Sequence, residues 1–241
     1  NTAMSYNEDS VTFNGTFRPF DWMSLTKFYG IKSTYNAGDD TYQFSSSSGT
    51  FILDGAGIDT ISAYSTSRDV MIDLRPGAHS HLGPQSSYIT AGNQLTISHG
   101  SNIENVLTGS GNDIVIGTDF DNVISTGSGS DTIFAGGGSD IIKSGTGTDR
   151  IDLSESVQSR DTVTLNATST DLGIDTIYGF SQGVFGDILD ISAILISVSE
   201  LFPLAVSWSA PTANFGGGIL RVVGSDVSNA SDLLAGFQAT R

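Results

Sequence analysis

Apolar residues near the start of the chain follow a helical spacing. Trp22, Leu25 and Tyr29 stand at positions i, i+3 and i+7, which places them on one side of a helix. Asp21 is a candidate N-cap, and Gly30 is a candidate C-terminal stop. This pattern predicts one short amphipathic helix ahead of a long segment with a different spacing.

From about residue 33 to 195, apolar and polar residues alternate with a period of two, which is typical of half-buried strands. Clusters of Gly, Asp, Ser and Thr separate these runs. Strands are predicted at 41–44, 51–53, 70–74, 95–97, 205–208 and 219–223, with a helix or strand at 231–237. We therefore divide the chain into 1–32, 33–195 and 196–241.

The strongest feature is an internal repeat nine residues long. Five tandem copies occupy 108–116, 117–125, 126–134, 135–143 and 144–152, and an isolated copy occupies 54–62. Six residues of each copy are typical of a turn and three of a short strand. Glycines at the second and fourth positions permit positive φ and close backbone approach. These glycines are Gly109, Gly111, Gly127, Gly129, Gly136, Gly138, Gly145 and Gly147.

The eighth position of every tandem copy is aliphatic. The residues are Val115, Ile124, Ile133, Ile142 and Ile151. One nonapeptide cannot bury such a side chain alone, but stacked strands bury a continuous column. We therefore predict a mainly β fold, a parallel β-roll with two repeats in each coil, within a β-sandwich-like domain that has one short helix near its N-terminus.

The sixth position carries the candidate chemistry. Its residues are Asp113, Asn122, Asp131, Asp140 and Asp149. In a roll, carboxylates on one side would stack at the strand spacing of about 4.8 Å and repel one another. A cation between successive turns removes this repulsion, and carboxylate with carbonyl oxygens suits Ca²⁺. The copy at 117–125 lacks both turn glycines and carries Asn122, so we expect a weak or empty site there.

Composition supports cation binding and excludes other chemistry. The formal net charge is −16, and all but four of the 26 acidic residues are aspartate. Such a charge opposes binding to nucleic acid. The absence of cysteine excludes disulfides, thiolate zinc sites and a cysteine nucleophile. No apolar run reaches the roughly 20 residues that span a bilayer. His79 and His81 lie in a segment rich in Gly, Pro and Ser that we interpret as a loop.

The repeat resembles the Gly-Gly-x-Gly-x-Asp-x-U-x nonapeptide of RTX proteins, a calcium-binding β-roll sequence. The flanking segments are similar to serralysins, which are metzincin zinc proteases. The similar segments are Met-Ser-Tyr at 4–6, the helix ending in Tyr-Gly at 29–30, and 39–44, 54–59, 102–105 and 187–192. At 39–44 the family has Asp-Thr-x-Tyr-Gly-Phe, and here Asp40 stands for Thr and Gln43 for Gly.

This resemblance implies roles for individual residues. Met4 would form the floor beneath a catalytic zinc, and Tyr6 would be a tyrosine that can ligate it. Asp54, Asp59 and Glu104 would be calcium ligands ahead of the roll. Main-chain oxygens would come from the neighbourhood of Ser33, Ala56, Gly57 and Asn102.

The function that these patterns favour is a calcium-binding module, the C-terminal part of a secreted bacterial serralysin-like zinc metalloendopeptidase. The module would support folding and type I secretion, and 196–241 would carry a candidate secretion signal. None of the three histidines precedes Glu, so the zincin motif His-Glu-x-x-His is missing. We therefore expect this chain to be inactive alone and to bind no zinc itself.

Two alternatives stay open. The chain starts in the middle of a pattern, so it could be a fragment or a processed product, paired with an N-terminal catalytic piece in a nicked or two-chain protease. It could also be a module of a large RTX adhesin or toxin.

Overall fold

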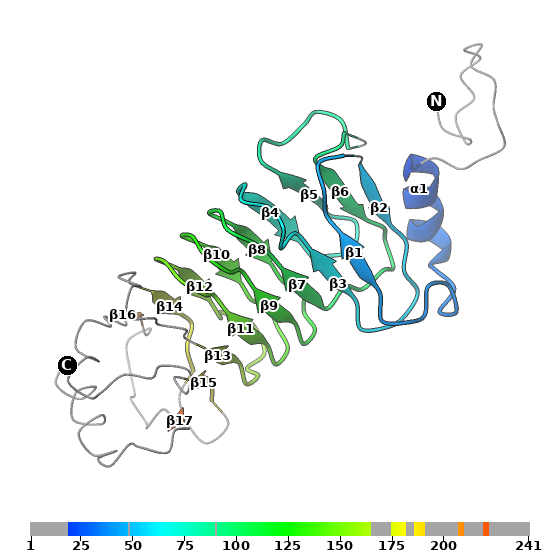
Figure 1. Ribbon diagram of the computed structural model, residues 1–241. Helices are drawn as coiled ribbons and strands as arrows, with labels where there is room; N and C mark the ends of the chain where they lie inside the picture. Colours follow the sequence, from blue (N-terminus) through cyan, green and yellow to red (C-terminus); the bar gives the residue numbers. More distant parts are fainter. Residues whose placement is uncertain are drawn as a thin grey trace, which may run out of the picture.

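The computed structural model shows a stack of short strands with one helix at its N-terminal end, next to β1 and β2 (Figure 1). It describes residues 19–47, 49–89, 91–164, 175–181, 186–190, 207–209 and 219–221. Met4, Tyr6 and the segment 231–237 lie outside the described residues. Within these ranges, no helix is long and apolar enough to cross a bilayer.

The strands form two sheets that face each other across the core. The first sheet consists, in spatial order, of β1 (Thr41–Gln43), β3 (Thr60–Ser62), β7 (Asn105–Leu107), β9 (Val123–Ser125), β11 (Ile141–Lys143), β13 (Thr162–Thr164), β15 (Ile188–Asp190) and β17 (Ile219–Arg221). The second consists of β16 (Ser207–Ser209), β14 (Thr176–Tyr178), β12 (Arg150–Asp152), β10 (Thr132–Phe134), β8 (Ile114–Ile116), β4 (Val70–Asp73), β5 (His79–Leu82), β6 (Gln94–Ile97) and β2 (Thr50–Ile52).

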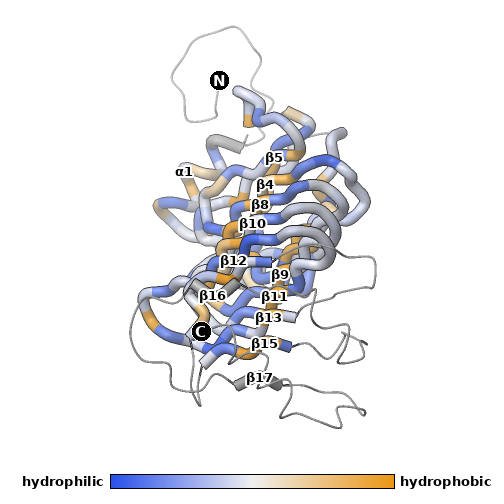
Figure 2. Tube along the Cα trace, turned by 90° about the vertical axis from the view of Figure 1, so that its left-hand side faces the viewer, coloured by the Kyte–Doolittle hydropathy of each residue, from blue (hydrophilic) through white to orange (hydrophobic). Residues whose placement is uncertain are grey.

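The repeats form the roll that the sequence predicts. Successive copies alternate between the sheets, so each coil contains two copies, and Ile133 pairs in parallel with Val115 and Ile151. The aliphatic eighth position lies between the sheets, and each of its five side chains is fully buried. Figure 2 shows apolar positions recurring along the strands and polar ones in the turns. The mainly β fold and the parallel β-roll are confirmed.

One strand, β5, departs from the parallel pattern. β5 lies between β4 and β6 and is antiparallel to both, so His79 and His81 belong to a strand and the interpretation as a loop was wrong. The buried positions of β5 are Ser80 and Leu82, and the polar Ser80 disguised the period of two. Its hydroxyl accepts a hydrogen bond from the Asp73 N–H at 3.0 Å. The two imidazoles bond separate partners within the chain.

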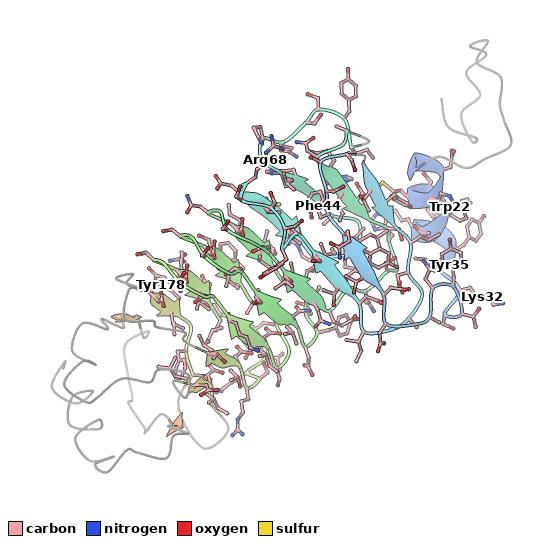
Figure 3. All side chains as sticks on the ribbon, viewed as in Figure 1. Trp22, Lys32, Tyr35, Phe44, Arg68 and Tyr178 are labelled. Atoms are coloured by element: carbon pink, nitrogen blue, oxygen red, sulfur yellow. The ribbon has the colours of Figure 1, made fainter. Side chains whose placement is uncertain are left out.

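The predicted helix is present as α1 (Pro19–Tyr29). It begins earlier than expected, so Asp21 lies in the first turn and is not the N-cap. Gly30 ends it with a φ of 71°, and its N–H donates to the Thr26 carbonyl at 2.9 Å. Tyr29 is 83% exposed, so it does not share the half-buried face of Trp22, which Figure 3 labels.

Adjacent isoleucines in β11 test the assignment of the core. Ile142 is fully buried between the sheets, whereas Ile141 points outward and is 42% exposed. In saturating calcium, Ile142→Ala should lower the free energy of unfolding by about 2–5 kcal/mol. Ile141→Ala, the matched control, should lower it by less than about 1 kcal/mol. Urea unfolding measures both, and equal losses would contradict the assignment.

Candidate calcium sites

The aspartates of the repeat turns are buried at the edges of the roll. Each stands immediately before its strand, and Asp113, Asp131, Asp140 and Asp149 are nearly inaccessible to solvent. Their main chains and carboxylates form a ladder between coils. The Asp113 N–H donates to Oδ1 of Asp131 at 2.8 Å, and the Asp131 N–H donates to Oδ1 of Asp149 at 2.9 Å. One oxygen of each receiving carboxylate is thus fixed by the neighbouring coil.

The second carboxylate oxygen has no partner. Oδ2 is buried and accepts no hydrogen bond in Asp59, Asp113, Asp131, Asp140 and Asp149. A buried charged oxygen without a partner is costly, so each such atom requires an explanation. A bound cation supplies one, because it would take the place of the missing donor. The residues present therefore fit an oxygen-ligated metal ion.

Burial also perturbs the acidity of these groups. Loss of solvent raises the pKa of Asp131 to about 6, of Asp149 to about 7 and of Asp140 to about 8. Hydrogen bonds from the neighbouring backbone act in the opposite direction, and nearby carboxylates raise the pKa further. Without a cation, burial in the roll therefore favours protonation of Asp140 and Asp149 near neutral pH, and protonation of Asp131 in mildly acidic solution.

The turn glycines bring main-chain oxygens of successive coils close together. Six of the eight predicted turn glycines have positive φ, and they are Gly127, Gly129, Gly136, Gly138, Gly145 and Gly147. A Cβ added at Gly145 would lie 1.6 Å from the carbonyl oxygen of Gly127. Gly109 and Gly111 lack positive φ, yet a Cβ there would lie 2.2 and 2.6 Å from main-chain oxygens of Thr66 and Arg68. Main-chain carbonyl oxygens of one coil thus lie against the turn glycines of the next coil, in the same turns that carry the buried carboxylates, and Ca²⁺ prefers such a mixture of oxygen ligands.

A second acidic cluster lies at the N-terminal end of the stack. Carboxylate oxygens of Asp40, Asp54 and Asp59 lie within 4.8 Å of one another. Glu104 lies next to this cluster, since its Oε2 accepts a hydrogen bond from the Asp59 N–H at 2.8 Å and, in addition to burial, its charge raises the pKa of Asp59. The sequence indicated three of these acids, and Asp40 was missed. Its position in the sequence could have indicated it, because Asp40 immediately precedes β1 as Asp59 precedes β3.

The main chain around this cluster is closely packed. The Ala56 N–H donates to Oδ1 of Asp54 at 3.0 Å. A Cβ added at Gly57 would lie 2.2 Å from the Gly38 carbonyl oxygen, and one at Gly55 would lie 2.3 Å from that of Lys32. Lys32, labelled in Figure 3, belongs to the segment between α1 and β1, where main-chain ligands were expected. Asn102 is exposed, two residues ahead of Glu104.

The ladder continues past the last tandem copy. The Asp140 N–H donates to Oδ1 of Asp161, and the Asp161 N–H to Oδ1 of Asp187, both at 2.9 Å. On the other edge the Asp149 N–H donates to Asp175 at 3.0 Å. Sequence reasoning missed these positions because the spacings are 21 and 26 residues. The usable signal was an Asp directly before a strand whose middle residue is aliphatic.

Comparison with known proteins agrees with this geometry. Residues 107–142 and 116–151 match the family model of the RTX calcium-binding nonapeptide repeat. The chain therefore carries calcium-binding RTX repeats within a β-roll.

Similar proteins indicate which kind of RTX protein this chain resembles. The chain is 30% identical over 144 residues to serralysin of Proteus mirabilis, covering 51% of this chain and 28% of the relative. It is 32% identical over 118 residues to metallopeptidase AprA of Pseudomonas marginalis, a match that covers 43% of this chain and 24% of the relative. It is 32% identical over 136 residues to serralysin C of Dickeya chrysanthemi, a match that covers 48% of this chain and 27% of the relative. The matches thus span about a quarter of each relative's length. The chain contains a serralysin-type C-terminal RTX region.

The acidity of the turns predicts an unusual pH dependence without calcium. Folded-state pKa values of about 8 for Asp140 and about 7 for Asp149 and Asp161 exceed the ordinary value of 3.8. The folded chain then binds more protons than the unfolded chain, so stability is lost as the pH rises through these values. In metal-depleted buffer, urea unfolding should show greater stability at about pH 5 than at about pH 8. Lower stability at pH 5 would contradict the assignment.

Proposed function

We propose that calcium ions bind between successive turns of the roll and that their binding supplies much of the free energy of folding. The carrying observation is the row of buried Oδ2 atoms without partners. Bound Ca²⁺ would neutralise carboxylates that otherwise must take up protons or repel one another. Because the sites form from stacked coils, they would be absent from the unfolded chain, and metal binding would be coupled to folding.

The proposed ligands come from two groups. In the roll they are the turn carboxylates Asp113, Asp131, Asp140 and Asp149 with main-chain oxygens near the turn glycines. Ahead of the roll they are Asp54, Asp59 and Glu104, with main-chain oxygens near Ala56, Gly57 and Asn102. We add Asp40, whose carboxylate lies within 4.8 Å of those of Asp54 and Asp59.

We further propose that the chain is the C-terminal part of a secreted zinc metalloendopeptidase. The names of the similar proteins, serralysin and metallopeptidase, support this parentage. In this proposal 1–32 is the end of a catalytic domain, 33–195 the roll domain, and 196–241 a β segment with a secretion signal. Zinc would bind in the catalytic part, near Met4 and Tyr6, and would activate water for peptide hydrolysis.

The surface of α1 favours contact with such a catalytic piece. Phe28 and Tyr29 are 79% and 83% exposed, whereas Asp21 and Thr26 of the same helix are buried. These two neighbouring exposed aromatic side chains at the end of α1 offer an apolar contact to a further domain. Low calcium inside the cell would keep the roll unfolded for export, and extracellular calcium would then fold it.

A matched pair of substitutions tests the calcium proposal. Asp131 is buried with an Oδ2 that lacks a partner, whereas Asp119 is an exposed aspartate of a neighbouring turn. Asp131→Asn should raise the calcium concentration at the folding midpoint by roughly tenfold or more, since a charged ligand is lost. Asp119→Asn, the control, should leave the midpoint nearly unchanged. Circular dichroism across a calcium titration measures both, and identical midpoints would refute the proposal.

The parentage is tested on native material. We expect the intact protein, isolated from its source with calcium present, to contain this chain together with a zinc-binding portion that bears His-Glu-x-x-His. Intact-mass analysis, zinc content and casein hydrolysis measure this directly. A native protein that contains this chain, lacks zinc and does not cleave casein would rule out the protease while leaving calcium binding intact.

A further inference from the structure

Asn122 is an amide in a column of acids. Seven residues each stand immediately before a strand of the first sheet, and they line one edge of the stack. They are Asp40, Asp59, Glu104, Asn122, Asp140, Asp161 and Asp187. Six of the seven carry a carboxyl group. Asn122 therefore occupies the middle of an acidic column, and four of its other members, Asp40, Asp59, Glu104 and Asp140, are proposed calcium ligands.

The side chain of Asn122 bonds differently from those of its neighbours. Oδ1 of Asp140 accepts a hydrogen bond from the coil before it, donated by the Asn122 N–H at 2.8 Å. Oδ1 of Asn122 instead accepts two bonds from its own turn, from the N–H of Thr118 at 2.8 Å and the hydroxyl of Thr118 at 3.1 Å. Its Nδ2 donates to the main-chain oxygen of Glu104 at 3.0 Å. The side chain of Asn122 thus donates a hydrogen bond to the preceding coil, whereas the side chain of Asp140 accepts one from it.

The polar atoms of Asn122 are satisfied by the chain. Its side chain is 1% exposed, yet both Oδ1 and Nδ2 have partners. Asp140, equally buried one coil further on, has an Oδ2 with none. Thr118 replaces the first turn glycine, and its hydroxyl also accepts the N–H of Phe120 at 3.1 Å. Thr118 and Phe120, which occupy the positions of the two consensus glycines, thus form hydrogen bonds that help to close the turn without a cation.

We propose that Asn122 holds no calcium ion and that its amide group replaces one between the coils of Glu104 and Asn122. An amide suits this place because it offers a donor to the Glu104 carbonyl without adding charge. The hydrogen-bonded layer divides the column into two calcium-binding blocks. Asp40, Asp59 and Glu104 form one, and Asp140 begins the other. This inference rests on the proposed function, in which the acidic layers bind calcium.

Counting the bound ions tests the proposal. Native mass spectrometry in calcium-containing volatile buffer gives the number of ions on the full chain. Asn122→Ala should retain the wild-type number, whereas Asp140→Ala should lose at least one ion. Loss of an ion from Asn122→Ala would overturn the inference alone. A wild-type chain that retains no calcium would overturn the proposed function together with it, so the two failures are distinguishable.

A second measurement needs no variant. Crystals of the wild-type chain grown with calcium should show an anomalous calcium peak within ligand distance, about 2.3–2.6 Å, of the Asp131 carboxylate. No peak should lie at that distance from Oδ1 or Nδ2 of Asn122. A calcium peak beside Asn122 would overturn the inference even if the alanine variant failed to fold.

Discussion

Burial of aspartate carboxylates in register along the edges of the roll is the constraint on which the structure depends. Parallel strands fix successive coils about 4.8 Å apart, so the acids of one edge cannot separate. The backbone ladder then fixes one oxygen of each receiving carboxylate, as where the Asp113 N–H donates to Asp131. In Asp131, Asp140 and Asp149 the remaining oxygen is buried without a donor, so it must be neutralised by a proton or a metal ion. The core offers little in compensation, because each three-residue strand of the repeats buries one aliphatic side chain in the central column.

The register between coils survives changes in loop length. Ile142 pairs with Val163, 21 residues on, and Ile151 pairs with Ile177, 26 residues on, in the same parallel manner as the 18-residue coils. The Asp before each strand keeps its bond to the preceding coil in these longer turns. An Asp directly followed by a short strand therefore defines the edge of the roll, and the number of residues in the turn matters less. This explains how the ladder extends past the tandem copies.

Much of the fold could be predicted because the nonapeptide encodes it locally. Glycine, Asp and an aliphatic residue at fixed positions determine the turn, the edge and the core, so the strands, their pairing and the buried Ile133 column followed from spacing alone. Contacts between distant segments could not be predicted in the same way. Asp40 joins Asp54 and Asp59 through pairing of β1 with β3, and the strand character of His79 and His81 depends on β4 and β6. The bonding of Asn122 was also hidden, because its composition alone does not say which coil its amide group contacts.

The amide protons of the turn aspartates report most directly on whether cations hold the coils together. The N–H groups of Asp113 and Asp131 each donate to a carboxylate of the next coil. Hydrogen exchange followed by NMR should show these amides strongly protected in calcium and exchanging at nearly unfolded rates after chelation at neutral pH. Equal protection with and without calcium would show that the roll stands without metal ions and would contradict the account.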